Sequence, residues 1–584
     1  MGGRSPESVE HGPLPPLLPP SFLDSAAVFC LVLVVLLSNG RPIGAGDTRP
    51  TERVAASLVE SFDFDLDEYP EVTPPFARRS GDHSVSIYPV LSAVLATPLF
   101  AACSGLIALD ETGTALAGKL AAALFSSLAA VFFFRALACR VPIAEARTAA
   151  LLLALGTSVW STSQALWQHP AAVLFLSLAL WFVLKAEDDD AWAGRAGLPL
   201  ALAVAARHAD VALVATLAIG IAVRWPRRIP SFLTWALAPV LFVAAYQFKY
   251  FGAPWRTGFS GALASRFSES LATGLPGLLF SPAKGLFVFT PVALVAVVGL
   301  FGVLRRGERW LPIVLGSACL AHLLLIGSWS EWHGGESFGP RMTTDLLPIL
   351  FVFLPAGFEA LPRLATSLAA ISVAVQALGA FTYDYRWERL YQRPAAPDHR
   401  ELWSIVESPL ALAVRERVIT LAAPGIAERR AFVSEYPLAP FSATGSRVTF
   451  PAGALRIDGS ENAFGNVLLQ RGARIVGDRL RLRGRFDALF LRVRDGARPR
   501  RLELRVSGRG QGVLYVGERS FGKPKTRWSE YPMNGAFAIR HPYFFAESGG
   551  GDVVVALGKE GGDTLLESVA LVSPREPENV IRLP

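Results

Sequence analysis

The chain has 584 residues, of which 52% are hydrophobic and only 18% are charged, and its mean hydropathy is +0.37. This composition excludes an ordinary soluble domain and indicates a protein that lives in a lipid bilayer. The formal net charge is +7, but Arg and Lys are spread between apolar runs, where they orient membrane helices, so we expect no nucleic-acid partner.

Apolar runs long enough to form membrane helices, which need about 20 residues, recur from near residue 25 to near residue 381. We expect about eleven transmembrane helices within residues 23–381, preceded by a proline-rich cytoplasmic tail at 1–22. The length of this tail argues that the first run, 25–38, is a retained helix and not a signal peptide. The cysteines lie in or beside apolar runs, which favours small core residues over disulfides. They are Cys30, Cys103, Cys139 and Cys319.

The charges between the runs predict the orientation of the helices. Short basic loops near 135–147, 185–195, 224–228, 305–309 and 363 are expected on the cytoplasmic side. This arrangement places the N-terminus inside and the C-terminus outside, provided that residues 87–109 lie in the membrane interface and do not cross it. Pro89 and Pro98 are compatible with an interfacial segment, and a true crossing is the alternative. The outer face then carries a long first loop, 39–114, the loops 166–170, 207–210, 247–285 and 328–344, and everything after about 382.

Polar side chains collect on this predicted outer face. The motif GDTRPTE at 46–52 places Asp47 beside Arg49 directly after the first helix, and Arg207 and His169 follow in short outer turns. Polar groups at membrane depth are costly and usually functional. Arg207 could instead snorkel to the lipid headgroups, and His169 could be a hydrogen-bonded interfacial residue.

Two further outer stretches, 250–291 and 328–348, are rich in Gly, aromatic and charged residues and contain Lys284, Trp332 and Arg341. Basic side chains gathered at an outer cavity would bind a lipid-linked phosphate or pyrophosphate. Trp332 is expected to belong to an interfacial aromatic belt, and a surface on which a sugar stacks is the alternative.

The acidic run DFDLDEYPE at 63–71 offers rival carboxylates in the same loop, namely Asp63, Asp65, Asp67 and Glu68. Hard oxygen ligands of this kind could form a weak metal site, but a solvated acidic loop is the commoner meaning of such a run. We therefore predict no metal site.

The sequence changes character after the last apolar run. Residues 382–441 are mixed and predict a juxtamembrane connector, whereas 442–584 alternate polar and apolar side chains, as in RLRLRGRFDALFLRVRD at 479–495. A period of two between Gly-rich turns predicts an extracytoplasmic β-sandwich or jelly-roll domain. Glycan binding, packing and acceptor docking are all compatible with such a module.

Residues 25–381 resemble the GT-C class of membrane glycosyltransferases, in the branch similar to protein mannosyltransferases and lipid A aminoarabinose transferases. The closest likeness is to phospholipid-carrier-dependent glycosyltransferases. The resemblance is carried by Asp47 and Arg49 after the first helix, Tyr88-Pro89, LWQHP at 166–170, GLLFSPAKGLFVFTP at 277–291 and WHGGESFGPRM at 332–342. Thr48 departs from the common Asp-Glu pair of the family, and Pro50 is expected to interrupt a helix that continues in relatives.

The resemblance implies an inverting transfer of a sugar from a polyprenyl-phosphate carrier to a glycan, lipid or protein acceptor. The reaction would take place on the outer face of a bacterial-type plasma membrane, with the polyprenyl-phosphate sugar as donor. A divalent metal is compatible with the sequence but is not indicated by it. Asp47 would be the general base, and Arg49, Arg207, Lys284 and Arg341 would bind the donor phosphate. The substrate cavity would contain Asp82, His83, Tyr88, Gln168, His169, Trp332, His333 and Glu336.

Three alternatives stay open at the level of sequence. Asp47 and Arg49 could form a local surface ion pair of little energetic value. The chain could be a transporter or flippase of a lipid-linked glycan, although no internal repeat typical of transporters is visible. It could also be a degenerate transferase core that serves as a scaffold for the β domain.

Overall fold

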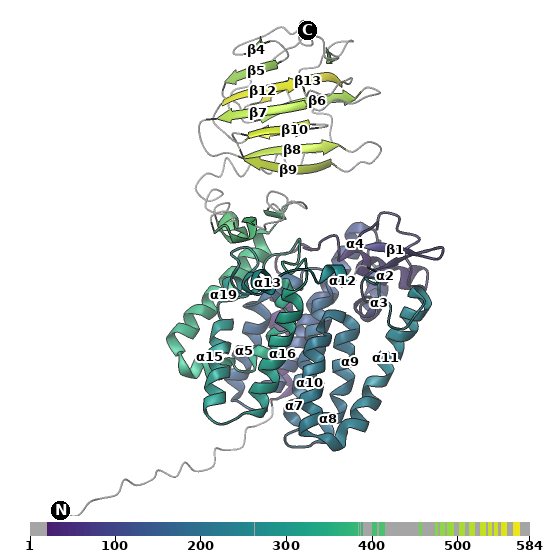
Figure 1. Ribbon diagram of the computed structural model, residues 1–584, viewed down its shortest axis with the longest axis vertical. Helices are drawn as coiled ribbons and strands as arrows, with labels where there is room; N and C mark the ends of the chain where they lie inside the picture. Colours follow the sequence, from purple (N-terminus) through teal and green to yellow (C-terminus); the bar gives the residue numbers. More distant parts are fainter. Residues whose placement is uncertain are drawn as a thin grey trace, which may run out of the picture. The chain divides into compact units, whose positions relative to one another are not determined.

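The computed structural model describes residues 20–383 except 262, short segments between 385 and 414, and separate strands between 455 and 572. The chain forms two compact units, Met1–Tyr385 with Pro397–Val414, and Arg386–Ala396 with Arg415–Pro584 (Figure 1). Residues 1–19 of the predicted tail and most of the predicted connector 382–441 lie outside the described residues. The domain boundaries predicted from sequence therefore stay predictions.

The first unit is helical apart from one hairpin. Its first half contains α1 (Phe22–Leu37), α2 (Arg49–Glu60), α3 (Leu91–Ser104), α4 (Glu111–Leu137), α5 (Ile143–Leu155), α6 (Ser158–Thr162), α7 (Gln168–Lys185), α8 (Ala191–Arg195) and α9 (Gly197–Ala206), with the hairpin β1 (Ala77–Ser80) and β2 (His83–Ser86). Its second half contains α10 (Val211–Arg224), α11 (Ile229–Phe251), α12 (Leu263–Arg266), α13 (Leu271–Phe280), α14 (Leu286–Phe289), α15 (Ala293–Arg305), α16 (Trp310–Gly327), α17 (Leu347–Phe351), α18 (Leu354–Ala360) and α19 (Pro362–Thr382). Short 3₁₀ turns are η1 (His208–Asp210), η2 (Pro226–Arg228), η3 (Arg341–Thr343) and η4 (Arg400–Trp403).

Five helical segments are long and apolar enough to cross a membrane: α4, α7, Pro226–Phe251, α16 and α19. Shorter apolar helices are α1, α3, α8–α9, α13 and α15. The multi-pass membrane architecture is thus supported, but the expected number of about eleven spans is not confirmed. Helix α3 has 14 residues and a length of about 21 Å, less than the roughly 30 Å hydrocarbon core. The interfacial position of 87–109 stays a prediction.

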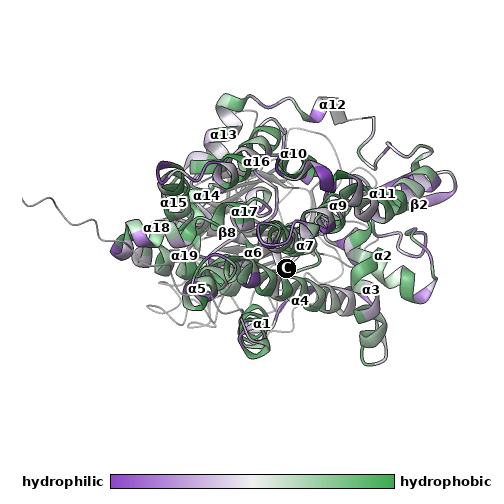
Figure 2. Ribbon diagram, turned by 90° about the horizontal axis from the view of Figure 1, so that it is seen from below, coloured by the Kyte–Doolittle hydropathy of each residue, from purple (hydrophilic) through white to green (hydrophobic). Residues whose placement is uncertain are grey.

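The helices differ in how much apolar surface they bury. In the view of Figure 2, α7 lies near the middle of the helical unit and α1 and α11 lie at its edge, and the helices are mostly hydrophobic. The most apolar window of α7 is 72% buried, whereas that of Pro226–Phe251 is 6% buried. Because α11 exposes large apolar side chains, among them Leu233, Trp235 and Leu241, its outer face is suited to lipid.

The charged loops fall into two separate sets. The predicted cytoplasmic loops pair among themselves, as in Arg147–Asp24 and Arg140–Glu308. The predicted outer loops do the same, as in Arg341–Asp47. Within the described residues no ion pair joins one set to the other, which supports the grouping of loops derived from charge.

The described strands of the second unit form three antiparallel sheets, with orders β10-β7-β12-β5-β4, β11-β8-β9 and β3-β13-β6. They are β3 (Leu455–Ile457), β4 (Ala473–Val476), β5 (Arg479–Gly484), β6 (Ala488–Asp495), β7 (Leu502–Gly508), β8 (Val513–Arg519), β9 (Thr526–Pro532), β10 (Gly535–Ile539), β11 (Pro542–Ala546), β12 (Gly551–Leu557) and β13 (Thr564–Val572). The packing of these sheets into a sandwich or jelly roll stays a prediction.

Candidate active site

Asp47 lies in the turn that leads into α2. The helix begins at Arg49 and has Pro50 in its first turn, where the missing N–H of proline needs no partner. The expectation that Pro50 interrupts a helix is therefore wrong, because this proline starts one. Gly46 makes the turn possible, since a Cβ there would lie 2.5 Å from the ring of Phe76.

Asp47 and Arg341 form the central ion pair of the site. Oδ2 of Asp47 lies 2.6 Å from Nη1 of Arg341, and the two side chains are 15% and 13% exposed. The guanidinium lies over the indole of Trp167, 4.2 Å from the ring centroid. Oδ1 of Asp47 and Nε of Arg341 have no hydrogen-bond partner within the described part of the chain. The pair thus leaves one buried acceptor and one buried donor unsatisfied.

The loop that carries Arg341 depends on glycine and on a buried lysine. Gly334, Gly335 and Gly339 all have positive φ, between +62° and +79°. Lys284 is only 1% exposed, and its Nζ donates to the carbonyl oxygens of Gly335, at 2.9 Å, and of Ser337, at 2.5 Å. Its ammonium group therefore fixes the backbone of this loop.

Arg49 pairs with Glu111 and not with Asp47. Its Nη2 lies 3.0 Å from Oε1 of Glu111, and both side chains are 52% exposed. The structure therefore does not contain the local Asp47–Arg49 pair that was one alternative from sequence. Exposed pairs of this kind contribute about 0–1 kcal/mol, so Arg49 can exchange its partner at little cost.

Glu52 is a second carboxylate of the same motif, and sequence reasoning did not select it. Its side chain is buried, and Oε1 accepts a long hydrogen bond of 3.5 Å from the backbone N–H of Leu166. Burial raises its pKa to about 7, because desolvation outweighs that hydrogen bond and the nearby Arg49 and Arg53. Glu52 thus joins α2 to the segment that precedes α7.

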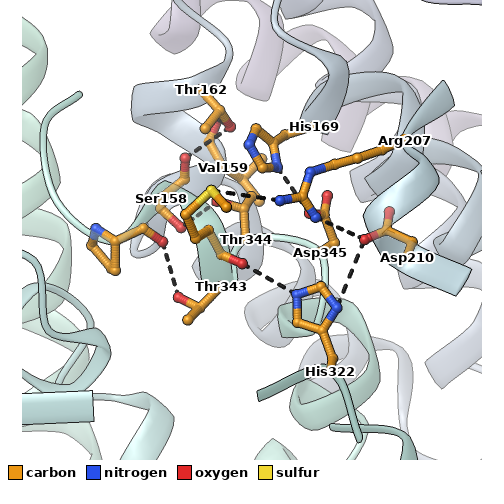
Figure 3. Close-up of polar contacts among 12 residues, drawn as sticks. Ser158, Val159, Thr162, His169, Arg207, Asp210, His322, Thr343, Thr344 and Asp345 are labelled. Atoms are coloured by element: carbon orange, nitrogen blue, oxygen red, sulfur yellow. Dashed lines mark hydrogen bonds and ion pairs between the residues drawn. The ribbon is translucent and has the colours of Figure 1, made fainter. Parts of the chain in front are cut away.

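Arg207 and His169 belong to a buried charge cluster, shown in Figure 3, together with Asp210, His322 and Asp345. Nη1 of Arg207 lies 2.9 Å from Asp210 Oδ1 and 2.9 Å from Asp345 Oδ2. Nδ1 of His169 donates to Asp345 Oδ2 at 2.8 Å. Arg207 is therefore held by two carboxylates and does not snorkel to headgroups.

Sequence reasoning missed three members of this buried charge cluster, Asp210, His322 and Asp345. A signal was present, because each is an ionisable residue within or beside an apolar run, and such residues are rare and usually functional. Asp345 follows Arg341 closely in the chain. The cluster therefore also fixes the end of the loop that carries Arg341.

The hairpin residues Asp82 and His83 lie in a different cluster. Asp82 is in the exposed turn, and Nδ1 of His83 lies 2.8 Å from Asp67 Oδ2 and 3.1 Å from Asp65 Oδ2. The hydrogen bond to Asp67 raises the pKa of His83, and the backbone N–H of Ser84 lowers that of Asp67. The acidic loop is therefore a network of local ion pairs.

The remaining predicted cavity residues are divided between two pockets and the core. Tyr88 lines a pocket with His208, Tyr246 and Gln247, while Glu336 lines another with Trp167 and Tyr383. Trp332 is fully buried, so its indole is in the packed interior and not in a surface belt. His333 and Gln168 are partly exposed, and Nδ1 of His333 accepts a hydrogen bond from the N–H of Gly335.

Comparison with family models and with curated proteins gave no match for the sequence. The structure is similar to that of ArnT from Cupriavidus metallidurans bound to undecaprenyl phosphate, with 14% identity, a TM-score of 0.44 and coverage of 71% of this chain and 72% of that chain. It is also similar to the Archaeoglobus fulgidus oligosaccharyltransferase tethered to an acceptor peptide, with 12% identity, a TM-score of 0.38 and coverage of 65% and 58%. Both are members of the GT-C superfamily, the class that the motifs resemble. At these scores no residue role passes from either protein to this chain.

Proposed function

We propose that this protein is a membrane glycosyltransferase that moves a sugar from a polyprenyl-phosphate carrier to an acceptor, with inversion at the anomeric carbon. The observation that carries the proposal is the Asp47–Arg341 pair, a mostly buried carboxylate and guanidinium that each keep an unpartnered polar atom. A sugar transferase needs this combination, because it must remove a proton and stabilise a departing phosphate at one place.

The reaction assigns a role to each group. The acceptor heteroatom attacks the anomeric carbon, the bond from that carbon to the phosphate oxygen breaks, and the polyprenyl phosphate leaves with the electron pair. The transition state resembles an oxocarbenium ion. Oδ1 of Asp47 takes the acceptor proton, while Oδ2 stays bound to Arg341.

Arg49 and Arg341 are the proposed partners of the departing phosphate. The phosphate gains negative charge as the bond breaks, and guanidinium groups bind such oxygens with charge-assisted hydrogen bonds. Arg49 can give up its exposed contact with Glu111 for a phosphate, because that surface pair is weak. The unpartnered Nε of Arg341 offers a second donor.

Lys284, Arg207 and His169 act through other residues in this proposal. Lys284 fixes the loop through Gly335 and Ser337. Arg207 and His169 bind Asp345, which follows Arg341 in the chain. The pocket lined by Trp167, Glu336 and Tyr383 contains residues of the same loop.

The proposed setting follows from the predicted topology. The site faces the outside of a bacterial-type plasma membrane, where the lipid-linked donor meets a glycan, lipid or protein acceptor. The C-terminal strands are proposed to form a domain on the same side that packs on the transferase or binds the acceptor. No cofactor beyond the donor lipid enters the reaction as proposed.

The test is the transfer of labelled sugar from a panel of polyprenyl-phosphate sugars into membrane extracts at equal expression. We expect Asp47→Asn to lose the wild-type signal by about 10²- to 10⁴-fold, because the general base is gone. The matched control is Asp190→Asn, which removes an exposed partner of Arg228 in a predicted cytoplasmic loop and should keep the signal.

Two other outcomes would redirect the proposal. A signal that survives Asp47→Asn but is lost in Asp63→Asn would move the chemistry to the acidic loop. No transfer with any donor, together with movement of labelled lipid across the bilayer of reconstituted vesicles, would support a flippase. Neither transfer nor movement would favour the scaffold role.

A further inference from the structure

The buried charge cluster has more negative than positive charge. Asp210 and Asp345 bring two carboxylates, and Arg207 brings one guanidinium between them. All three side chains, together with His322, are at most 5% exposed. Burying an uncompensated charge costs several kcal/mol, so the excess negative charge is removed either by a proton on one carboxyl or by a further positive partner.

The histidine geometry shows where this partner is needed. Nε2 of His322 lies 3.2 Å from the carbonyl oxygen of Met342. A carbonyl only accepts, so Nε2 carries the hydrogen and Nδ1 of the neutral ring presents a lone pair. Nδ1 lies 3.8 Å from Asp210 Oδ1, which is too long for a hydrogen bond.

Three buried residues of the cluster therefore each keep one unpartnered acceptor atom. Asp210 Oδ2, His322 Nδ1 and Asp345 Oδ1 have no hydrogen-bond partner among the described residues. One ligand atom from each of these three residues lies within 4.8 Å of the other two. Lone pairs that face one another repel, and a single proton on Nδ1 would satisfy only one of the two carboxylates.

We propose that Asp210, His322 and Asp345 bind a divalent transition-metal ion, with Zn²⁺ the best match. One imidazole and two carboxylates are typical zinc ligands, whereas Ca²⁺ and Mg²⁺ take oxygen ligands. A tetrahedral ion with bonds of about 2.0–2.1 Å places its ligand atoms about 3.3 Å apart, so a small inward movement closes the site. A small anion such as hydroxide in the fourth position makes the total charge of the cluster zero.

The surroundings have the hydrogen bonds expected around a metal site. Ligating histidines almost always donate their other N–H to a carbonyl or carboxylate, as His322 does to Met342. Ligating carboxylates are themselves hydrogen-bonded, as Asp210 is to Arg207 and Asp345 is to Arg207 and His169. These contacts fix the imidazole ring and the two carboxylates that supply the proposed ligands.

The ion would have a structural role. Its ligands come from η1, from α16 and from the segment after η3, so it ties together three parts of the chain that are distant in sequence (Figure 3). The three ligands are fully buried, which leaves no exposed position for a substrate. This inference stands independently of the proposed transfer reaction.

The test is elemental analysis of the full-length protein purified in detergent with metal-free buffers. We expect about one zinc ion per wild-type chain, and at least a tenfold lower content in His322→Gln and Asp345→Asn. The matched control is His208→Gln, which changes a histidine outside the three ligands and should keep the metal. X-ray absorption at the zinc edge should show nitrogen and oxygen ligands only.

A second readout uses the wild-type chain, so that a variant that fails to fold does not decide the outcome. Chelation should lower the thermal unfolding temperature of the wild type, and added Zn²⁺ should restore it, since an ion that binds only the folded state stabilises it. Wild-type protein that is folded but free of metal would overturn the proposal and leave a protonated His322 with a bridging water. Sulfur ligands at the zinc, or full metal content in folded His322→Gln, would overturn it as well.

Discussion

Replacing Glu52 by glutamine tests the buried start of α2. Glu52 lies against Gly118 of α4, whose added Cβ would be 3.0 Å from Glu52 Cγ, and its carboxyl group accepts a long hydrogen bond from the backbone N–H of Leu166. Burial raises its pKa from 4.5 to about 7, so the folded protein holds this proton more tightly than the unfolded chain does. Glutamine keeps the shape of the side chain and removes the titration.

The size and sign of the effect follow from this shift. The pKa of Glu52 is about 2.5 higher in the folded protein than in the unfolded chain. At 1.36 kcal/mol for a pKa difference of one, this lowers the free energy of unfolding at high pH by about 3 kcal/mol. Below about pH 4.5 both states are protonated, and the free energy of unfolding is unaffected by Glu52. It falls as the pH rises from about 4.5 to about 7, because the unfolded chain loses the proton first, and it stays lower above pH 7.

The assay is the thermal unfolding temperature of the detergent-purified protein between pH 5 and pH 8. We expect Glu52→Gln to remove part of the loss of stability toward pH 8 and to be more stable than the wild type there. Glu145→Gln changes an exposed glutamate of α5 and should follow the wild type. Identical pH dependence in wild type and Glu52→Gln would refute the assignment of a raised pKa to this carboxyl.

Three further predictions concern the groups around Asp47. Arg49→Gln should raise KM for the donor lipid about tenfold or more and leave the unfolding temperature unchanged, whereas Arg306→Gln, which breaks a similar exposed pair, should change neither. Equal effects of both variants on KM would argue against a phosphate contact. Lys284→Met should lower both kcat and stability, by about 3 kcal/mol, because two charge-assisted hydrogen bonds are lost; unchanged stability would show that the loop is held otherwise. Gly339→Ala should cost about 1–3 kcal/mol, since φ is +79° and the new Cβ would lie 2.7 Å from a phenylalanine ring, and a neutral result would contradict this close approach.

The fold was predicted best where hydropathy and charge form patterns over long stretches of the sequence. Apolar runs predicted a multi-pass helical protein, and the distribution of Arg and Lys grouped the loops into two sets that the ion pairs reproduce. The number of spans was harder to predict, because hydropathy does not show where a helix breaks. Around residues 196–223 the run divides into α9 and α10, with Arg207 and Asp210 at the break.

The partners of the charged residues could not be predicted from local sequence. Asp47 and Arg49 are close neighbours in the chain, yet Asp47 pairs with Arg341 and Arg49, the first residue of α2, pairs with Glu111. Pro50 was misjudged for a related reason, since the effect of proline depends on whether it stands inside a helix or in its first turn.

The long-range pairing of the buried charge cluster has a consequence for the synthesis of the protein. A chain is made from its N-terminus, so His169 must wait for the synthesis of 176 further residues before its carboxylate partner Asp345 exists. The amide of Asn39, at the end of α1, waits for 341 residues before it can bind the carbonyl oxygen of Ala380. Until then His169 lacks its carboxylate partner and Arg207 has only Asp210, and a truncated chain keeps this defect permanently. Completion of the last membrane helices thus supplies the partners that close these buried contacts.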